Sequence, residues 1–153
     1  MKIFTLVFVM SKSQILLGLK KRGLGEGKWN GFGGKVELNE IVIQGAVREL
    51  REESGVVADE CNLLRRGVIT MYFENGDGPF LIHVFQCNEW KGEITETEEM
   101  KPQWFDIDRI PYDLMWSEAR LWYPVFLSGC SFEASFSYDT KGDIIEHVIN
   151  RLP

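Results

Sequence analysis

The sequence has no long hydrophobic run. Hydrophobic residues make up 44% of its 153 residues, but no stretch approaches the roughly 18 consecutive apolar residues of a transmembrane helix. The most apolar segment, residues 3–10, is short and lacks a convincing cleavage site, so a β-strand explains it better than a signal peptide does. We therefore expect a soluble protein with no membrane partner, located in the cytoplasm, with mitochondria and the nucleus as alternatives.

Cysteine, histidine and positive charge are also scarce. The three cysteines are an odd number without metal-ligand spacing, which argues against a disulfide scaffold and for reduced thiols. The two histidines are isolated, so a catalytic triad is disfavoured. A net charge of −6 disfavours a nucleic-acid polymer as partner. A small polyanion is compatible with this charge, because acidic groups loaded with divalent ions attract phosphates.

The length fits one compact domain. A chain of 153 residues can bury a substantial core, and this chain has no internal repeat, low-complexity run or Pro/Ser-rich linker. We expect a single domain over residues 1–153, and a monomer. Strands are predicted at about 2–10, 14–20, 66–74, 79–88, 101–106, 131–138 and 143–150.

Two helices are predicted, over residues 40–54 and 117–127. Asn39 is the expected N-cap of the first helix and Gly55 its C-terminal stop. Pro124 should shorten or kink the second helix. One early helix and one late helix among many strands predict an α+β fold, a sandwich around a mixed sheet.

Three carboxylates share one face of the first predicted helix. Glu49, Glu52 and Glu53 lie at positions i, i+3 and i+4. Like charges about 5 Å apart cost about 3 kcal/mol per pair at an effective dielectric constant near 20, unless a cation lies among them. A solvated charged helix is the alternative interpretation. It is weakened by Arg48, which can brace Glu52 from one turn away, and by the Gly-rich residues 31–35, which can turn a carbonyl toward a metal ion or phosphate.

Residues 34–56 match the pattern G-x5-E-x7-R-E-U-x-E-E-x-G-U, with U aliphatic, at every specified position. This segment resembles the signature of the Nudix hydrolases. The rest of the chain resembles the oxidised purine nucleoside triphosphate hydrolases of that family, also called 8-oxo-dGTP diphosphatases. The segments that carry this second likeness are Thr5–Val7, Leu16–Gly23, Trp29–Lys35, Glu98–Pro102, Trp104–Phe105, Met115–Trp116 and Trp122–Pro124.

The resemblance implies a fold and an activity. The fold is a Nudix-type α/β/α sandwich with a mixed β-sheet and two main helices. The activity is magnesium-dependent hydrolysis of oxidised purine nucleoside triphosphates, such as 8-oxo-dGTP or 2-hydroxy-dATP, to the monophosphate and pyrophosphate. Such a reaction sanitises the nucleotide pool and so avoids DNA damage. Manganese is an alternative cofactor.

The resemblance also implies a set of metal ligands. They are the Gly33 carbonyl and the side chains of Glu49, Glu52, Glu53 and Glu99. Glu98 replaces Glu99 if the register slips by one residue. We expect Glu53 to be the general base. Glu49 stays open as the second choice, because sequence alone does not separate coupled carboxylates. On an ideal helix Glu40 lies about 180° from Glu49, which excludes it from the metal cluster.

Substrate contacts are implied on both sides of the signature. They are Thr5, Lys20, Asn30, Phe32, Gly33, Gly34, Lys35, Trp116, Ser117, Glu118 and Ala119. Trp116 is expected to stack on the purine rather than serve as a core aromatic residue, and the Asn30 amide is expected both to donate to and to accept from its edge. Met71 and Phe73 are weaker candidates. The Gly-rich residues 23–28 match neither a P-loop nor a dinucleotide fingerprint and predict a surface loop.

One position departs from the oxidised-purine pattern. The related enzymes carry two adjacent aspartates that read the purine, whereas this chain has Glu118 followed by Ala119. A site that loses such a partner loses discrimination. This difference keeps two alternatives open. One is a Nudix hydrolase of another nucleoside diphosphate derivative, such as a dinucleoside polyphosphate or nucleotide sugar, and the other is a catalytically silent nucleotide-binding module.

Overall fold

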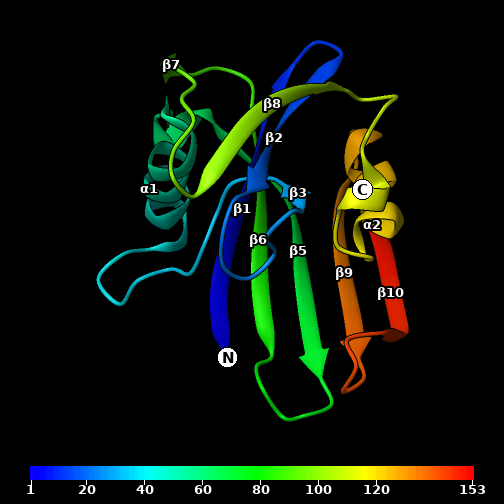
Figure 1. Ribbon diagram of the computed structural model, residues 1–153. Coiled ribbons are helices and arrows are strands. Elements are labelled where there is room, and N and C mark those ends of the chain that lie inside the picture. Colours follow the sequence, from blue (N-terminus) through cyan, green and yellow to red (C-terminus); the bar gives the residue numbers. More distant parts are fainter.

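The computed structural model describes residues 1–153, and its fold is built around one mixed β-sheet (Figure 1). Its strands are β1 (Lys2–Ser11), β2 (Gln14–Lys20), β3 (Trp29–Asn30), β5 (Leu63–Phe73), β6 (Phe80–Cys87), β8 (Met100–Asp106), β9 (Ser131–Tyr138) and β10 (Ile144–Leu152). The strand order is β10-β9-β5-β6-β1-β2-β3, and β8 also pairs with β2. The β1–β6 and β5–β9 pairs are parallel and the others antiparallel, which confirms the predicted mixed sheet.

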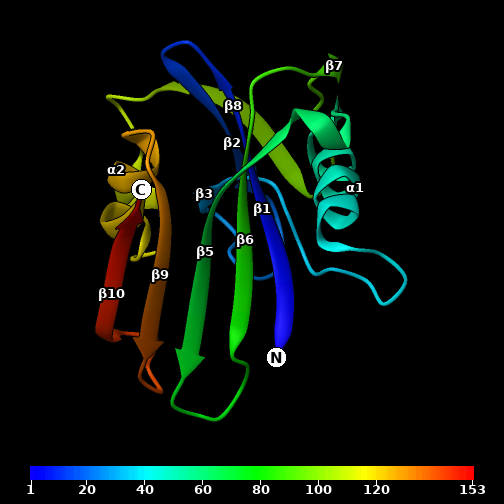
Figure 2. The ribbon, with the colours of Figure 1, turned by 180° about the vertical axis from the view of Figure 1, so that it is seen from behind.

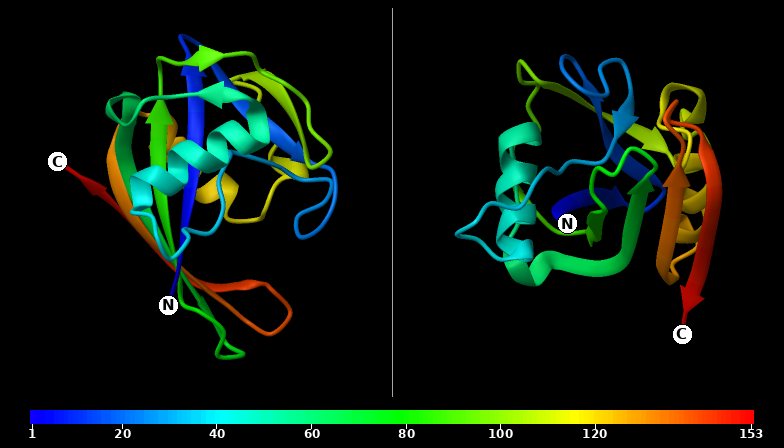
Figure 3. Two further views of the ribbon diagram at one scale, coloured as in Figure 1. Left: turned by 90° about the vertical axis from the view of Figure 1, so that its left-hand side faces the viewer. Right: turned by 90° about the horizontal axis from the view of Figure 1, so that it is seen from below.

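Two helices cover opposite faces of this sheet, α1 (Val42–Ser54) and α2 (Ala119–Leu127). Successive side chains of a strand point to opposite faces. In β1, accordingly, Val7 lies in the core on the α1 side and Phe8 in the core on the α2 side. Figure 3 shows the sheet between the two helices, and Figure 2 shows β8 crossing from one helix toward the other. The predicted α/β/α sandwich is confirmed.

The predicted strands are all present, although their ends shift. The strand β5 differs most, because it begins at Leu63 rather than at 66. The strands β1 and β2 form a hairpin, in which Ser11 pairs with Gln14. The sequence missed β3, β4 (Val56–Val57) and β7 (Lys91–Gly92), since two residues show no alternation; β4 and β7 form a separate two-stranded sheet. The remaining elements are the 3-10 helices η1 (Glu60–Asn62) and η2 (Tyr112–Leu114).

The predicted start of the first helix was wrong. The N-cap of α1 is Ile41 rather than Asn39, and its backbone N–H donates to the Gln44 side chain at 3.0 Å. Glu40 stays outside the helix because its carboxylate accepts from the Glu37 backbone N–H at 2.9 Å, which closes a turn. At the other end the prediction is confirmed, since Gly55 has a φ of 80° and its N–H donates to the Arg51 carbonyl.

The second helix is shorter than predicted. It begins at Ala119, because Ser117 and Glu118 form a turn before it, and it runs for nine residues with Pro124 inside. No helix of the structure combines the length and hydrophobicity needed to cross a bilayer. Because both helices pack on the one sheet, we propose that residues 1–153 form a single domain.

The packing of α1 gives a stability test. Leu50 on α1 is fully buried, whereas Leu64 on β5 is 47% exposed. Leu50→Ala should lower the free energy of unfolding by about 2–5 kcal/mol, because it loses apolar burial and leaves a cavity. The control Leu64→Ala should lower it by less than about 1 kcal/mol. Urea unfolding measures both, and equal losses would contradict the assigned core.

Candidate active site

The guanidinium of Arg48 lies at the centre of an acidic cluster. Its Nε and Nη2 donate to the Glu40 carboxylate at 3.0 and 2.7 Å, and its Nη1 donates to Glu49 at 3.1 Å and to Glu52 at 3.2 Å. These bonds hold the pKa of Glu40 down at about 2. They also raise the pKa of Arg48 above its ordinary value. One guanidinium therefore bonds to three carboxylates.

The helical position assumed for Glu40 was wrong, whereas its exclusion from the metal ligands stays a prediction. The argument assumed that Glu40 lies on the helix, but α1 begins two residues later at Val42. From the preceding turn, Glu40 reaches back to Arg48 and forms the closest ion pair of the cluster. Arg48 does brace the carboxylates, as its position one turn from Glu52 indicated.

Two glycines bring the backbone against the helical acids. The Gly33 N–H donates to Glu53 Oε1 at 2.9 Å. A Cβ atom at Gly33 would lie 1.8 Å from the Thr5 carbonyl oxygen, and one at Gly34 would lie 2.6 Å from Glu49 Oε1. Only glycine therefore fits at position 33, whereas a side chain at position 34 would require the Glu49 carboxylate to move. No donor in the protein bonds to the Gly33 carbonyl oxygen, which leaves it free for another partner.

Burial perturbs two of the acids on α1. It raises the pKa of Glu53 to about 7, against the opposing hydrogen bond from the Gly33 N–H. Burial also raises the pKa of Glu49, although the hydrogen bond from Arg48 opposes it. A buried carboxylate prefers the neutral form unless a cation approaches. Both groups would thus bind a positive ion more readily than exposed acids do.

The segment that contains Glu99 also contributes an acid to this site. Glu99 precedes β8 and accepts from Lys20 Nζ at 3.4 Å and from Arg22 Nη2 at 3.1 Å. These contacts, chiefly that of Arg22, lower the pKa of Glu99. Glu99 and Lys20 both influence the pKa of Glu53, so the structure brings the predicted residues of this segment to the same site.

The cluster has the chemistry of a site for a hard divalent ion, although its acids do not converge on one point. No three acidic, histidine or cysteine side chains are arranged to enclose an ion, because Arg48 Nη1 lies between Glu49 and Glu52. The atoms available as metal ligands are the carboxylate oxygens and the Gly33 carbonyl oxygen. Oxygen atoms of these kinds are the ligands that Mg²⁺ prefers. The pKa values of the buried acids Glu49 and Glu53 are raised, so the positive charge near them does not offset the cost of their burial. The residues present fit a divalent cation.

An apolar cavity lies on the α2 side of the sheet. It is lined by Leu6, Trp29, Asn30, Ile69, Met71, Ile82, Met115, Trp116, Glu118, Ala119, Trp122 and Tyr123. Its volume is about 40 Å³, which is room for about one water molecule. The loop before β3 narrows the entrance, since Lys28 Nζ lies 5.2 Å from the centre of the Trp116 ring. A nucleobase needs more space than this cavity offers.

The cavity contains one acid. Glu118 is 9% exposed, and burial raises the pKa of its carboxyl group. The neighbouring Tyr138 hydroxyl is buried without a well-formed hydrogen bond, and burial raises the Tyr138 pKa as well. Ala119 lines the same wall and adds no polar group.

Several predicted contact residues lie outside this cavity. Thr5 faces the α1 side, where its hydroxyl makes only a long contact of 3.5 Å to the Gly34 carbonyl. Phe32 is fully buried in the core on the α1 side. Lys35 and Ser117 are exposed, and neither lines the cavity. Whether these four residues contact another part of the substrate stays a prediction.

Sequence reasoning missed two residues of the cavity wall and entrance. Tyr123 is fully buried and donates its hydroxyl hydrogen to Asn30 Oδ1 at 2.8 Å. The spacing of Ala119, Trp122 and Tyr123 at i, i+3 and i+4 was the available signal, because it predicts one buried face of the helix. Lys28 was assigned to a surface loop, and nothing local indicated its contact with Trp116.

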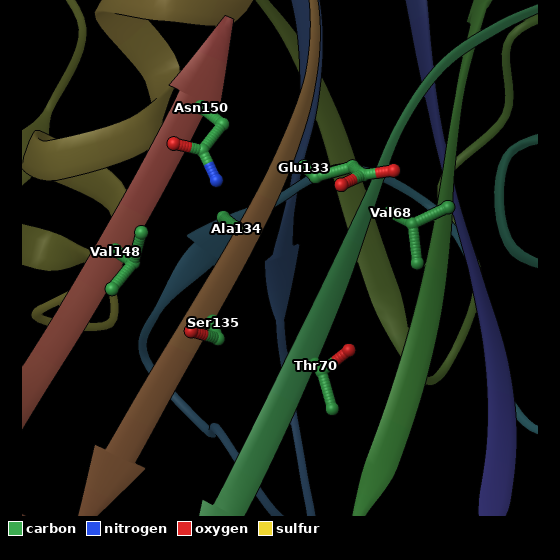
Figure 4. Close-up of a pocket in the computed structure, with 7 residues that line it drawn as sticks. All are labelled: Val68, Thr70, Glu133, Ala134, Ser135, Val148 and Asn150. Carbon is green, nitrogen blue, oxygen red and sulfur yellow. The ribbon is translucent and has the colours of Figure 1, made fainter.

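A wider hollow lies on the open face of β5, β9 and β10. Figure 4 shows the residues around it, Val68, Thr70, Glu133, Ala134, Ser135, Val148 and Asn150. Its volume is about 340 Å³, but Glu133 is its only charged residue. A single acid without a basic partner offers no set of groups for a metal ion or for phosphates. The acidic cluster and the small cavity are the better candidate site.

Comparisons with known proteins agree with this geometry. The family model described as "NUDIX domain" matches residues 3–126. The chain is 43% identical to the oxidized purine nucleoside triphosphate hydrolase of Danio rerio and 38% identical to that of Mus musculus, in each case over 99% of this chain and 96% of the relative. The fold is similar to that of the MutT protein of Bacillus halodurans, with a TM-score of 0.82, 24% identity and 98% coverage of both chains.

The buried carboxyl of Glu53 predicts a pH dependence of stability in metal-free protein. Its pKa of about 7 in the folded state exceeds the value of about 4.3 in an unfolded chain. The stabilisation is therefore complete at acidic pH and is lost as the pH rises through 7. From pH 5 to pH 8 this group should remove up to about 3 kcal/mol from the free energy of unfolding.

Urea unfolding with a chelator at pH 5 and pH 8 measures this loss. Glu53→Gln should abolish most of the difference, whereas Glu60→Gln, at an exposed acid, should leave it unchanged. Mg²⁺ should restore stability at pH 8 in the wild-type protein. The same pH dependence in wild type and Glu53→Gln would contradict the assignment.

Proposed function

The chain belongs to the Nudix hydrolase family, and on that premise we propose that it hydrolyses oxidised purine nucleoside triphosphates to the monophosphate and pyrophosphate. Substrates would include 8-oxo-dGTP and 2-hydroxy-dATP. The observation that carries this proposal is the 43% identity, over 99% of the chain, to a relative named for that activity. The cluster of helical acids on one face of the sheet and the cavity with aromatic walls on the other face support it.

Nudix hydrolases generally use a divalent metal ion. We propose Mg²⁺ here, with Mn²⁺ as a substitute, held by the Gly33 carbonyl and by Glu49, Glu52, Glu53 and Glu99. When bound, the ion would neutralise the triphosphate and make the attacked phosphorus more electrophilic. The support is the oxygen-only donor set and the unpaired Gly33 carbonyl.

Glu53 is the best candidate for the general base. A base works best when its pKa lies near the operating pH, and the pKa of Glu53 is about 7. The Gly33 N–H fixes one of its oxygens, which leaves the other to take a proton from the attacking water. Glu49 is less suited, because Arg48 already donates to its carboxylate.

One short segment would connect the two halves of the site. Asn30 lines the cavity, and Gly33, three residues later, bonds to Glu53 on the α1 side. A base held beside Trp116 and Asn30 would therefore direct its triphosphate toward the acids. Lys20, which contacts Glu99, would bind a phosphate oxygen.

Two other proposals follow from the proposed activity. We propose that the protein works as a monomer, and that it resides in the cytoplasm with mitochondrial and nuclear fractions as alternatives. A nucleotide-pool enzyme needs only its small substrate and metal ion as partners.

Ala119 favours one alternative function. Without a second acid in the cavity, the enzyme could act on another nucleoside diphosphate derivative, such as a dinucleoside polyphosphate or a nucleotide sugar. A silent binding module is less well supported, because the acids of the signature are all present.

A substrate panel decides among these functions. Pyrophosphate release from 8-oxo-dGTP and 2-hydroxy-dATP should exceed that from dGTP in kcat/KM, and chelation of the metal should abolish it. Faster cleavage of diadenosine polyphosphates or nucleotide sugars would favour the alternative. Inactivity toward the whole panel with Mg²⁺ and Mn²⁺ would point to the binding module.

Removal of the base should separate catalysis from folding. Glu53→Gln should keep the wild-type circular dichroism spectrum and lower kcat by about 10²- to 10⁴-fold, which is the usual contribution of a general base. The control Glu60→Gln should retain full activity. Near wild-type turnover in Glu53→Gln would transfer the role to Glu49.

A further inference from the structure

Three consecutive basic residues, Lys20, Lys21 and Arg22, contact one acidic segment at the start of β8. Lys20 ends β2, which pairs with β8. Beyond this pairing, the Lys21 backbone N–H donates to the Glu99 carbonyl at 2.8 Å, and Lys21 Nζ donates to the Thr97 carbonyl at 2.9 Å. The bonds of Lys21 therefore extend the contact between the two strands and hold Glu99 beside the other two basic side chains.

The Glu99 carboxylate is bonded by these two side chains at once. Its Oε2 accepts from Lys20 Nζ at 3.4 Å, and its Oε1 accepts from Arg22 Nη2 at 3.1 Å. Arg22 also lies 3.7 Å from the Glu98 carboxylate. Each oxygen of Glu99 thus faces a cation of the protein.

A divalent ion at Glu99 would compete with these two cations. The ion would bind the same carboxylate, and positive charges a few ångströms apart repel one another. Besides burial, which has the largest effect, Lys20 and Glu99 influence the pKa of Glu53, so this competition takes place beside the acids of α1. Binding of an ion would therefore weaken the bonds from Glu99 to Lys20 and Arg22.

Arg22 can exchange its partner more easily than Arg48 can. The Arg22 side chain is 59% exposed, and exposed ion pairs contribute little to stability. The Arg48 side chain is 25% exposed and bonds three carboxylates. A released arginine fork matches the oxygens of a phosphate group and can bond two of them in parallel. Arg22 is therefore the arginine of this site that is available to an anion.

We propose that Arg22 is a further phosphate-binding residue, and that Glu99 holds its guanidinium until a divalent ion takes over the carboxylate. Ion binding and phosphate binding then strengthen each other, and this coupling is equal in both directions. The proposal rests on the proposed function for its metal ion and its polyphosphate substrate. It adds to that function a residue outside the Nudix signature and a reason why the ion must bind for the phosphates to be held.

Manganese alone tests the first half of the exchange. Free Mn²⁺ is measured by electron paramagnetic resonance during a titration at low ionic strength, where ion pairs are least screened. Arg22→Gln should tighten Mn²⁺ binding by about two- to fivefold, because the ion no longer displaces a guanidinium. The control Lys101→Gln removes an equal charge two residues from Glu99, at a side chain that is not bonded to it. This control should leave the Mn²⁺ affinity unchanged.

Inorganic pyrophosphate tests the second half. Calorimetry measures its dissociation constant at a fixed concentration of free Mn²⁺ and, separately, with a chelator. With Mn²⁺, Arg22→Gln should weaken pyrophosphate binding by about 5- to 10-fold, because a charge-assisted hydrogen bond is lost. With the chelator, Glu99→Gln should tighten it by about two- to fivefold, because Lys20 and Arg22 are then released. Lys101→Gln should change neither constant.

The two measurements separate the exchange from a general effect of structure or charge. Opposite changes in Arg22→Gln, tighter for the ion and weaker for pyrophosphate, would support the proposal. It would be overturned by an unchanged Mn²⁺ affinity, by weaker binding of both probes, or by the same changes in Lys101→Gln. A wild-type protein that binds no Mn²⁺ would also overturn it. If Arg22→Gln fails to fold, the effect of Glu99→Gln with the chelator decides.

The test is independent of nucleotide hydrolysis, because neither probe contains a nucleoside. Intact exchange in a protein that hydrolyses no nucleotide would support the proposal and reject the proposed function. Hydrolysis of oxidised purine nucleoside triphosphates without the opposite changes in Arg22→Gln would support the proposed function and reject this proposal.

Discussion

The shared guanidinium of Arg48 is the interaction on which the site depends. It joins Glu40 of the turn before α1 to Glu49 and Glu52 of the helix, and it also donates to the Lys35 carbonyl at 3.3 Å. Partly buried carboxylates at this spacing would repel one another without a cation. The planar arginine fork offers five N–H donors in a fixed geometry, so it can bond one carboxylate through two nitrogens and still reach others. The same group therefore positions the helix start, the acids and the Gly-rich backbone.

The division of the sheet into two faces explains why the two halves of the site can differ so much. On the α1 side, charge and glycine backbone dominate, whereas on the α2 side aromatic residues enclose a small cavity. The segment from Asn30 to Gly33 connects them, because Asn30 lines the cavity and Gly33 meets Glu53. Phe32 lies between these positions and anchors the segment in the core. Under the proposed function, the base would bind on one face of the sheet and the phosphates on the other, at residues close together in sequence.

Local patterns predicted most elements and the acids, since helical spacing alone places Glu49, Glu52 and Glu53 on one face. The sequence could not predict contacts that join distant segments. Tyr123 reaches Asn30 across 93 positions, and the turn that removes Glu40 from α1 depends on a hydrogen bond from Glu37. The strand order could not be predicted either, because the alternation of apolar and polar residues shows which residues form strands but not which strands pair. Two-residue strands such as β3 leave no periodic signal.

The parallel pairing of β1 with β6 has a consequence for how the chain is made. Lys2 aligns with Phe80, so the outer edge of β1 has no native neighbour until that later segment exists. At a ribosomal rate of about 5–20 residues per second, this interval lasts roughly 4–16 s. During that time the nascent β1–β2 hairpin exposes apolar side chains and one strand edge without hydrogen-bond partners. Chaperones bind surfaces of this kind. Closure of the sheet therefore belongs to the last stage of synthesis, when β9 reaches β5.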